Sequence, residues 1–199
     1  MRFEERVLGL LVKYASVYKE VFLDYEYLLY NPSFIDNPYY IVSAVEGHFG
    51  HLTGVHSIIP AKDFFIKCYN STISETDFDL MKRYINRKDM KGAIVDKMKA
   101  FGALSTFFSS KLQAKENFSK GKIHCHIATT DSQVTVGFVN NKYANPKTLL
   151  KGNELFLSRV VDISLVLRRD HGTNKFDTII QGDIESILSA HSELARITV

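Results

Sequence analysis

The sequence has little of the material from which disulfide frameworks and membrane spans are built. Its 199 residues include two cysteines, Cys68 and Cys125, and neither is part of a Cys-x-x-Cys arrangement. Two isolated thiols do not make a disulfide framework, so a reducing compartment is the simpler expectation. No apolar run approaches the roughly 18 residues of a membrane-spanning helix, and the first residues lack the apolar stretch of a signal peptide. We therefore expect a cytoplasmic protein that has no membrane partner.

Charge of one sign is also not in large excess. There are 25 Lys and Arg against 22 Asp and Glu, which gives a net charge of +3. This mildly basic balance permits a polyanionic partner without being diagnostic of one. Apolar residues make up 45% of the sequence, enough for an ordinary core. With no internal repeat or low-complexity segment, the chain is expected to form a single domain over residues 1–199.

The first part of the chain has the period of helices. Apolar residues from Phe3 to Phe22 recur at helical spacing and predict an amphipathic helix of five or six turns. Aromatic and β-branched residues then predict strands over 25–30 and 39–45. Further apolar stripes predict helices after Pro60, over 77–86 and over 91–113. The phenylalanines of these stripes are expected in the core rather than as a base-stacking platform.

From Lys122 onward the apolar period is two, which is typical of strands. Strands are predicted from 122 to 127, from 134 to 138, from 161 to 168 and from 176 to 180, and Asp183 is expected to cap a last short helix. Helices followed by strands indicate an α+β fold, in which amphipathic helices pack on an antiparallel sheet of about four or more strands. The helical segment of about 61–113 is then inserted between strands. The second face of the sheet is expected to be polar and free, with Lys122, His124, His126, Thr135, Asp162 and Ser164 on it.

Residues 48–55, with the sequence HFGHLTGV, gather groups suited to proton transfer. Imidazoles are the side chains whose ordinary pKa lies closest to neutrality, so His48 and His51 are candidates for acid–base work. Thr53 adds a hydroxyl, and Gly50 and Gly54 let the backbone turn tightly or approach another segment closely. The alternative is a loop with exposed histidines, since a short motif is only a hypothesis.

Two short motifs resemble those of a known family. Residues 49–54 read FGHLTG and residues 146–151 read PKTLLK, in an order and at a spacing similar to the phage-associated barnase–EndoU–colicin–RelE-like nucleases. That family carries a Phe-x-His-Leu-Thr-Gly stretch and, after a strand, a Pro-Asn-Thr-Leu-Leu-Lys-like stretch. Lys147 departs from the second pattern, where asparagine is usual. The resemblance covers roughly residues 25–180 and implies helical elements followed by a curved sheet whose open face holds RNA.

The resemblance implies a metal-independent endoribonuclease that uses no cofactor. In such enzymes a base deprotonates the ribose 2′-hydroxyl, an acid protonates the leaving 5′-oxygen, and cationic donors hold the phosphorane. Motif positions carry over as catalytic candidates, with His51 as acid or base. The full set of catalytic candidates is His51, Thr53, Thr148 and Lys151, and the substrate-binding candidates are His48, Tyr143, Lys147, His124, His126 and Arg168. Alternatively, Thr148 caps a turn, Lys151 is a solvated loop residue, and Arg168 is solvated charge at a strand end.

His124 and His126 alternate with Cys125 on a predicted strand, so both point to one face. With His51 as a third ligand they would form a zinc site, although no Asp or Glu completes a close ligand cluster. They are equally consistent with a general acid and base on an RNA-facing sheet, or with ordinary polar residues. Cys125 itself is expected to be a small core residue.

The sequence thus leads to two functional hypotheses of different classes. The first is an endoribonuclease toxin with an RNA substrate and a protein or RNA antitoxin, acting in bacterial toxin–antitoxin or phage-defence biology. The second is a non-catalytic RNA- or protein-binding module on the same fold. A phosphoryl- or nucleotidyl-modifying enzyme ranks third because no Gly-rich loop is present to cradle a nucleotide phosphate. Under the first hypothesis, His51 and Thr53 should meet Thr148 and Lys151 in one cleft.

Overall fold

A sheet of nine strands forms the centre of the structure, a computed structural model that describes residues 1–140, 143–155 and 158–198. The strands lie in the order β11-β10-β1-β2-β8-β7-β6-β5-β9. Their bounds are β1 Tyr25–Tyr30, β2 Tyr39–Val42, β5 Gln113–Lys120, β6 Ile123–Thr130, β7 Val134–Val139, β8 Tyr143–Lys151, β9 Val161–Asp162, β10 Leu165–Asp170 and β11 Thr178–Gln181. A separate two-stranded sheet pairs β3 (His56–Ser57) with β4 (Phe78–Asp79).

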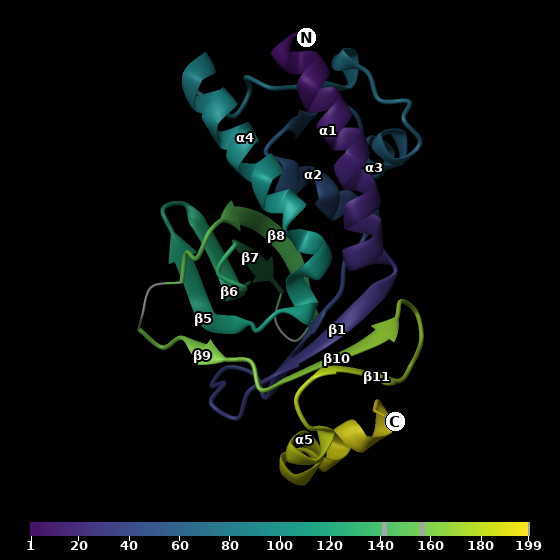
Figure 1. Ribbon diagram of the computed structural model, residues 1–199, viewed down its shortest axis with the longest axis vertical. Coiled ribbons are helices and arrows are strands. Elements are labelled where there is room, and N and C mark those ends of the chain that lie inside the picture. Colours follow the sequence, from purple (N-terminus) through teal and green to yellow (C-terminus); the bar gives the residue numbers. More distant parts are fainter. Residues whose placement is uncertain (141–142, 156–157, 199) are drawn as a thin grey trace.

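The helices form two groups on different sides of the sheet. Figure 1 shows α1 to α4 together at one end of the molecule and α5 at the other end, beyond β1, β10 and β11. The α-helices are α1 Phe3–Tyr18, α2 Phe49–Thr53, α3 Ala61–Tyr69, α4 Arg87–Gly102 and α5 Ile184–Ala190. The shorter turns are the π-helix η1 Lys19–Leu23 and the 3₁₀ helices η2 Glu46–His48, η3 Glu75–Asp77, η4 Leu104–Ser109 and η5 Ser192–Arg196. No helix in the described part of the chain is long and apolar enough to cross a membrane.

The first helix presents one apolar face to the core, as its sequence predicts. Val7, Leu11 and Ala15 recur at helical spacing and are buried. The α-helix ends at Tyr18, and the predicted remainder is a π-helical turn in which the Asp24 N–H donates to the Lys19 carbonyl at 2.9 Å. The main core lies between these helices and the sheet. Its fully buried aromatic residues include Phe49, Phe64, Phe101, Phe107 and Phe138, so the predicted core role of the helical phenylalanines is confirmed.

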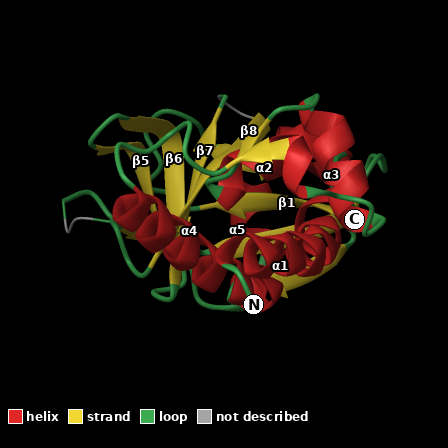
Figure 2. Cartoon of the chain, turned by 90° about the horizontal axis from the view of Figure 1, so that it is seen from above, coloured by secondary structure: helices red, strands yellow, loops and turns green. Residues whose placement is uncertain are grey.

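The sheet is mixed, whereas an antiparallel sheet was predicted. β2 runs parallel to β8, and among the described residues Ile41 pairs with Tyr143 and Val42 with Ala144. β2 ends at Val42, earlier than predicted, and the chain then leaves the sheet. Because β2 departs there, α2 and α4 pack against β8 in its place. Figure 2 shows β5 to β8 side by side, with α4 and α1 together along one side of the strands.

The second face of the sheet is only partly the free polar face that was predicted, because apolar clusters cover parts of it. α5 and η5 cover one part of it through an apolar cluster. A smaller cluster covers another part and consists of Phe118, Cys125, Ala128 and Leu155. Thr135, predicted to be solvent-facing, is buried, and its hydroxyl donates to the Gly152 carbonyl at 2.8 Å. Of the six residues predicted on that face, five are exposed as expected: Lys122, His124, His126, Asp162 and Ser164.

Other predicted elements differ in place or type. The helix predicted over 77–86 is wrong: β4 and a series of turns take its place, because the Asp79 carboxylate accepts the backbone N–H groups of Met81 and Lys82 at 2.7 and 3.1 Å. α4 begins earlier than predicted, with Asn86 as its cap. β5 was not predicted, and the expected loop at 148–151 belongs to β8. The cap at Asp183 is confirmed, since its side chain accepts the Glu185 N–H at 3.1 Å.

Gly182 lies close to the backbone of Ser164, and this contact yields a stability prediction. Gly182 has φ +87°, and a Cβ there would lie 2.0 Å from the Ser164 carbonyl oxygen. Gly182→Ala should therefore lower the free energy of unfolding by at least about 1–3 kcal/mol, measured by urea denaturation. The matched control is Gly92→Ala inside α4, where nothing lies within 4 Å of the added methyl. That change should raise stability by roughly 0.5–1 kcal/mol, and equal effects of the two variants would contradict the account.

Candidate active site

The HFGHLTGV stretch folds as the 3₁₀ turn η2 followed by α2. Phe49 and Leu52 anchor it, because both side chains are fully buried. The Phe49 ring lies 5.4 Å from that of Tyr18, measured between centroids, within a cluster of aromatic rings. His48 and His51 remain accessible on the outside of the turn. The alternation of apolar anchors with histidines therefore fixes the imidazoles at the surface of a rigid element.

Thr53 closes the end of α2. Its hydroxyl donates to the Gly50 carbonyl at 2.9 Å and accepts the Val55 N–H at 3.2 Å, and the residue is fully buried. Both hydrogen-bonding functions of the hydroxyl are thus engaged inside the turn. Thr53 was expected to contact a phosphate oxygen. In the structure its hydroxyl instead stabilises the end of α2.

Gly54 leaves room for the side chain of Lys97, which lies directly against the backbone there. The residue has φ +75°, and a Cβ there would lie 2.7 Å from Cδ of Lys97 and 3.1 Å from the Tyr84 hydroxyl. Tyr84 donates to the Gly54 carbonyl at 3.0 Å. Beyond Gly54, Nζ of Lys97 donates to the Leu149 carbonyl at 2.9 Å. Lys97 therefore connects the two sequence motifs, which are 95 residues apart in the chain when counted from Gly54 to Leu149.

The ammonium of Lys97 is largely buried. Burial, together with the nearby positive charge of Arg83, lowers the pKa of Lys97 to about 8. In the part of the chain that the structure describes, no carboxylate forms an ion pair with it, and the adjacent Asp96 instead pairs with Lys151 at 3.4 Å. The site thus holds a buried cation whose charge is balanced only by a carbonyl dipole.

Next to α2 lies a pocket of about 160 Å³. Three elements supply its polar groups: His51 comes from α2, His56 from β3 and Arg83 from the turns after β4. Its lining contains no carboxylate and consists of Gly47, Gly50, His51, Val55, His56, Ser57, Ile59, Ala61 and Arg83. Arg83 forms no ion pair with any residue that the structure describes, so its guanidinium is available to an anion.

Burial and the neighbouring cations act together on His51. Partial burial lowers the pKa of the His51 imidazole, and the positive charges of Arg83 and then Lys147 lower it further. The pKa of His48 is also lowered, by burial and by His51. Because a lowered pKa leaves an imidazole neutral at pH 7, His51 has the protonation state of a general base.

Lys147 is placed by a β-bulge between β7 and β8. Gly137 pairs with Thr148 while Phe138 pairs with Pro146, so Lys147 is the extra residue. Its ammonium donates to the His124 carbonyl at 3.2 Å and contributes to lowering the pKa of His51. The structure thus brings Lys147 into electrostatic reach of His51.

The other positions of the second motif are not gathered around His51. Thr148 is 5% exposed, and its methyl group lies against Gly137 on the face of the sheet that carries Cys125. Lys151 lines a different pocket, of about 210 Å³, together with Lys97 and Asp96. The expected single cleft for all four motif residues therefore does not form; β8 carries Lys147 toward His51 and Lys151 toward α4.

The remaining predicted site residues do not line the pocket beside α2. His124 shares a hydrogen bond of 3.1 Å with Ser119, and Tyr143 is 57% exposed at the start of β8. Within the described ranges, no three His, Cys, Asp or Glu side chains are placed to hold a metal ion, so the zinc alternative at His124 and His126 lacks a third ligand there. Arg168 stacks on the Tyr25 ring at 4.3 Å, in a pocket beside η1.

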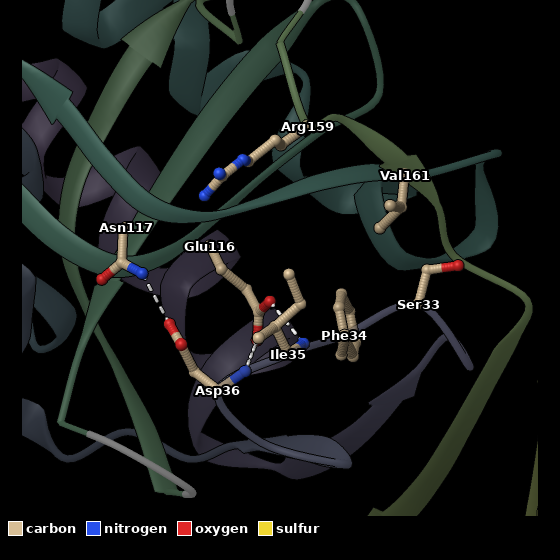
Figure 3. A pocket seen from close by; sticks show the side chains of 8 residues that line it. All are labelled: Ser33, Phe34, Ile35, Asp36, Glu116, Asn117, Arg159 and Val161. Carbon is tan, nitrogen blue, oxygen red and sulfur yellow. Dashed lines mark hydrogen bonds between the residues drawn. The ribbon is translucent and has the colours of Figure 1, made fainter.

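A larger pocket, of about 260 Å³, lies between the β1–β2 connection and β5 (Figure 3). The Glu116 carboxylate accepts the backbone N–H groups of Ile35 and Asp36 at 2.8 and 3.0 Å and thereby fixes this connection to the sheet. Figure 3 shows Arg159 on the wall opposite these acidic residues. Two carboxylates in its lining disfavour a phosphate, so this pocket is the weaker candidate for a nuclease site.

Sequence reasoning did not find His56, Arg83 or Lys97 as site residues. Arg83 lies in the segment that was predicted as a helix, and Lys97 lies on the polar side of an ordinary apolar stripe. His56 follows the recognised motif by two residues without being part of it. Only Gly54 carried a signal, because a glycine in a motif indicates close approach of another group, although it does not say which.

A comparison with known families covers nearly the whole chain. A family model described as "phage-Barnase-EndoU-ColicinE5/D-RelE like nuclease4" matches residues 10–193, a segment that contains both motifs. Searches of curated proteins and of solved structures gave no significant match. The resemblance found in the motifs is thus confirmed over a longer segment than the motifs alone indicated. The chain belongs to the phage-Barnase-EndoU-ColicinE5/D-RelE like nuclease4 family.

Proposed function

We propose that this nuclease cuts RNA without a metal ion, by attack of the ribose 2′-hydroxyl on the adjacent phosphate, with His51 as a proton-transfer residue. The observation that carries the proposal is the pocket in which His51 lies beside the unpaired guanidinium of Arg83. Cations that face no carboxylate suit the phosphodiester anion, and an imidazole suits proton transfer near neutral pH.

In the proposed step, neutral His51 takes the proton of the 2′-hydroxyl while the 2′-oxygen bonds to phosphorus. The bond between phosphorus and the 5′-oxygen then breaks, which leaves a 2′,3′-cyclic phosphate and a 5′-hydroxyl end. Arg83 and Lys147 stabilise the negative charge that develops on the phosphorane. Lys97 keeps β8, and with it Lys147, at a fixed distance from α2.

The experiment that tests the function is incubation of the purified protein with total RNA, with and without EDTA, followed by mapping of the cleavage ends. Cleavage that survives EDTA and leaves 2′,3′-cyclic phosphates supports the proposal. Sensitivity to EDTA contradicts metal independence. Binding to RNA without cleavage between pH 5 and 8 favours a non-catalytic RNA-binding module instead.

The first variant to measure is His51→Ala. Loss of the imidazole should slow cleavage about 10²–10⁴-fold, which is the usual contribution of a general acid or base. The matched control is His171→Ala, because His171 is exposed in the turn after β10 and far along the chain from both motifs. An unchanged rate in His51→Ala, with the fold intact by circular dichroism, would contradict the assignment of His51.

The charges around the pocket predict how the cleavage rate depends on pH. His51 has a pKa below its ordinary 6.5, so the base form, and hence the rate, should increase as pH rises through a midpoint below 6.5. Arg83→Gln should raise the pKa of His51, and Lys147→Gln should raise it less, because Arg83 has the larger influence. Burial remains in both variants, so neither should bring the pKa fully back to 6.5.

The pKa of His51 is measured by NMR titration of the ring protons, which does not depend on activity. Lys88→Gln, on the exposed side of α4, serves as the charge-matched control and should leave the titration unchanged. A midpoint above 6.5 in the unaltered protein, or equal shifts in all three variants, would contradict this electrostatic account.

We also propose that the nuclease acts as a toxin in toxin–antitoxin or phage-defence biology, with a protein or RNA antitoxin as partner. The support is the family, whose name associates these nucleases with phage. Expression should arrest bacterial growth, and His51→Ala should relieve the arrest. Equal toxicity of the two forms would separate toxicity from the proposed chemistry.

A further inference from the structure

The pocket beside α2 contains two imidazoles, and the proposed step needs two proton transfers. We propose that His56 is the second proton-transfer residue of this site and donates a proton to the leaving 5′-oxygen after His51 has activated the 2′-hydroxyl. The inference rests on the proposed function and extends it to a residue outside both sequence motifs. It assigns the acid and the base to different histidines.

The backbone explains why residues 51 and 56 line the same pocket. α2 ends at Gly54 in the left-handed conformation, so the chain reverses direction within two residues. His56 then begins β3, which pairs with β4 through His56 and Asp79. Both imidazoles consequently line the pocket of about 160 Å³, together with Arg83. A phosphate held by Arg83 would thus have an imidazole from α2 and another from β3 next to it.

The two imidazoles are also free to exchange protons. Neither the His51 ring nor the His56 ring has a hydrogen bond or ion pair with any described side chain or backbone group. By contrast, Nδ1 of His48 accepts the Val45 N–H at 3.4 Å, and His124 is bonded to Ser119. Proton transfer requires one ring nitrogen that is not engaged, and in each ring of the pocket pair both nitrogens meet this requirement within the described structure.

The charged groups around the pair favour a division of roles. Arg83, from the turns after β4, lines the same pocket as both histidines, and Glu46 of η2 pairs with Lys62 of α3 at 3.8 Å near the start of that helix. Asp79, opposite His56 in β4, is engaged with backbone N–H groups. Burial and the nearby cations lower the pKa of His51, so His51 is the ring that is neutral and suited to be the base. The leaving 5′-oxygen then takes its proton from the other histidine that lines the pocket, His56.

The two imidazoles account for both proton transfers of the proposed step. His51 receives the proton of the 2′-hydroxyl, and the 2′-oxygen forms its bond to phosphorus. The bond between phosphorus and the 5′-oxygen breaks with its electron pair left on that oxygen, which takes the proton from the His56 imidazolium. The enzyme ends with His51 protonated and His56 neutral, and exchange with solvent restores the starting state.

The test uses two versions of one RNA oligonucleotide, cut at a mapped bond that carries either the natural 5′-oxygen or a bridging 5′-sulfur. A thiolate leaves without a proton, so the sulfur substrate does not need the acid. His56→Ala should slow cleavage of the natural bond about 10²–10⁴-fold, and should cleave the sulfur bond at nearly the unaltered rate. His51→Ala should be slow on both, and the His171→Ala control should cut both normally.

Equal losses of His56→Ala on the two substrates would overturn the proposal, as would rescue of His51→Ala by sulfur. If His56→Ala does not fold, His56→Asn is measured on the same pair of substrates, because asparagine keeps a polar side chain in β3 without a titrating group. If the unaltered protein cuts neither substrate, the proposed function fails. If it cuts both and the His56 variants cut the natural bond normally, only this inference fails.

Discussion

The hydrogen bond from the Lys97 ammonium to the Leu149 carbonyl, made across Gly54, is the interaction on which the candidate site depends. It joins α4 to β8 at 2.9 Å, and the stem of the same side chain lies against the end of α2. β2 ends at Val42, and beyond that residue α2 and α4 pack against β8. Lys97 and α2 both contact β8, and they bring the two motifs, which are distant in sequence, close together. Any side chain at Gly54 would compete with the lysine for the same space.

This arrangement concentrates positive charge around one imidazole. Arg83 has no ion-pair partner in the described structure, Lys97 is balanced only by a carbonyl, and Lys147 reaches the His124 carbonyl. Together with burial, the charges of Arg83 and Lys147 lower the pKa of His51. A phosphodiester entering the pocket would meet cations and a neutral base, which are the two requirements of 2′-hydroxyl attack. The same charges that prepare the base thus also favour the substrate.

Much of the fold could be predicted from the sequence because its periodicity is strong. The apolar face of α1 and the later strands β6 and β7 follow from spacing, and the strand at 25–30 follows from its aromatic residues. The parallel contact of β2 with β8 could not be predicted, since it joins segments 102 residues apart and leaves no local pattern. Of the candidate site, the motif identified His51 and placed Thr148 and Lys151 in the second segment. Whether these meet depends on the bulge at Lys147 and on side-chain direction, which a motif does not encode.

Attack by the ribose 2′-hydroxyl is tested by replacing a single ribose with 2′-deoxyribose at one mapped cleavage site in an otherwise unaltered RNA. The account predicts that this one bond is no longer cut, because the attacking oxygen is gone, while neighbouring sites are cut at their former rates. Cleavage of the deoxy bond at an unchanged rate would show that water or another nucleophile attacks the phosphate, and it would contradict the mechanism built on His51.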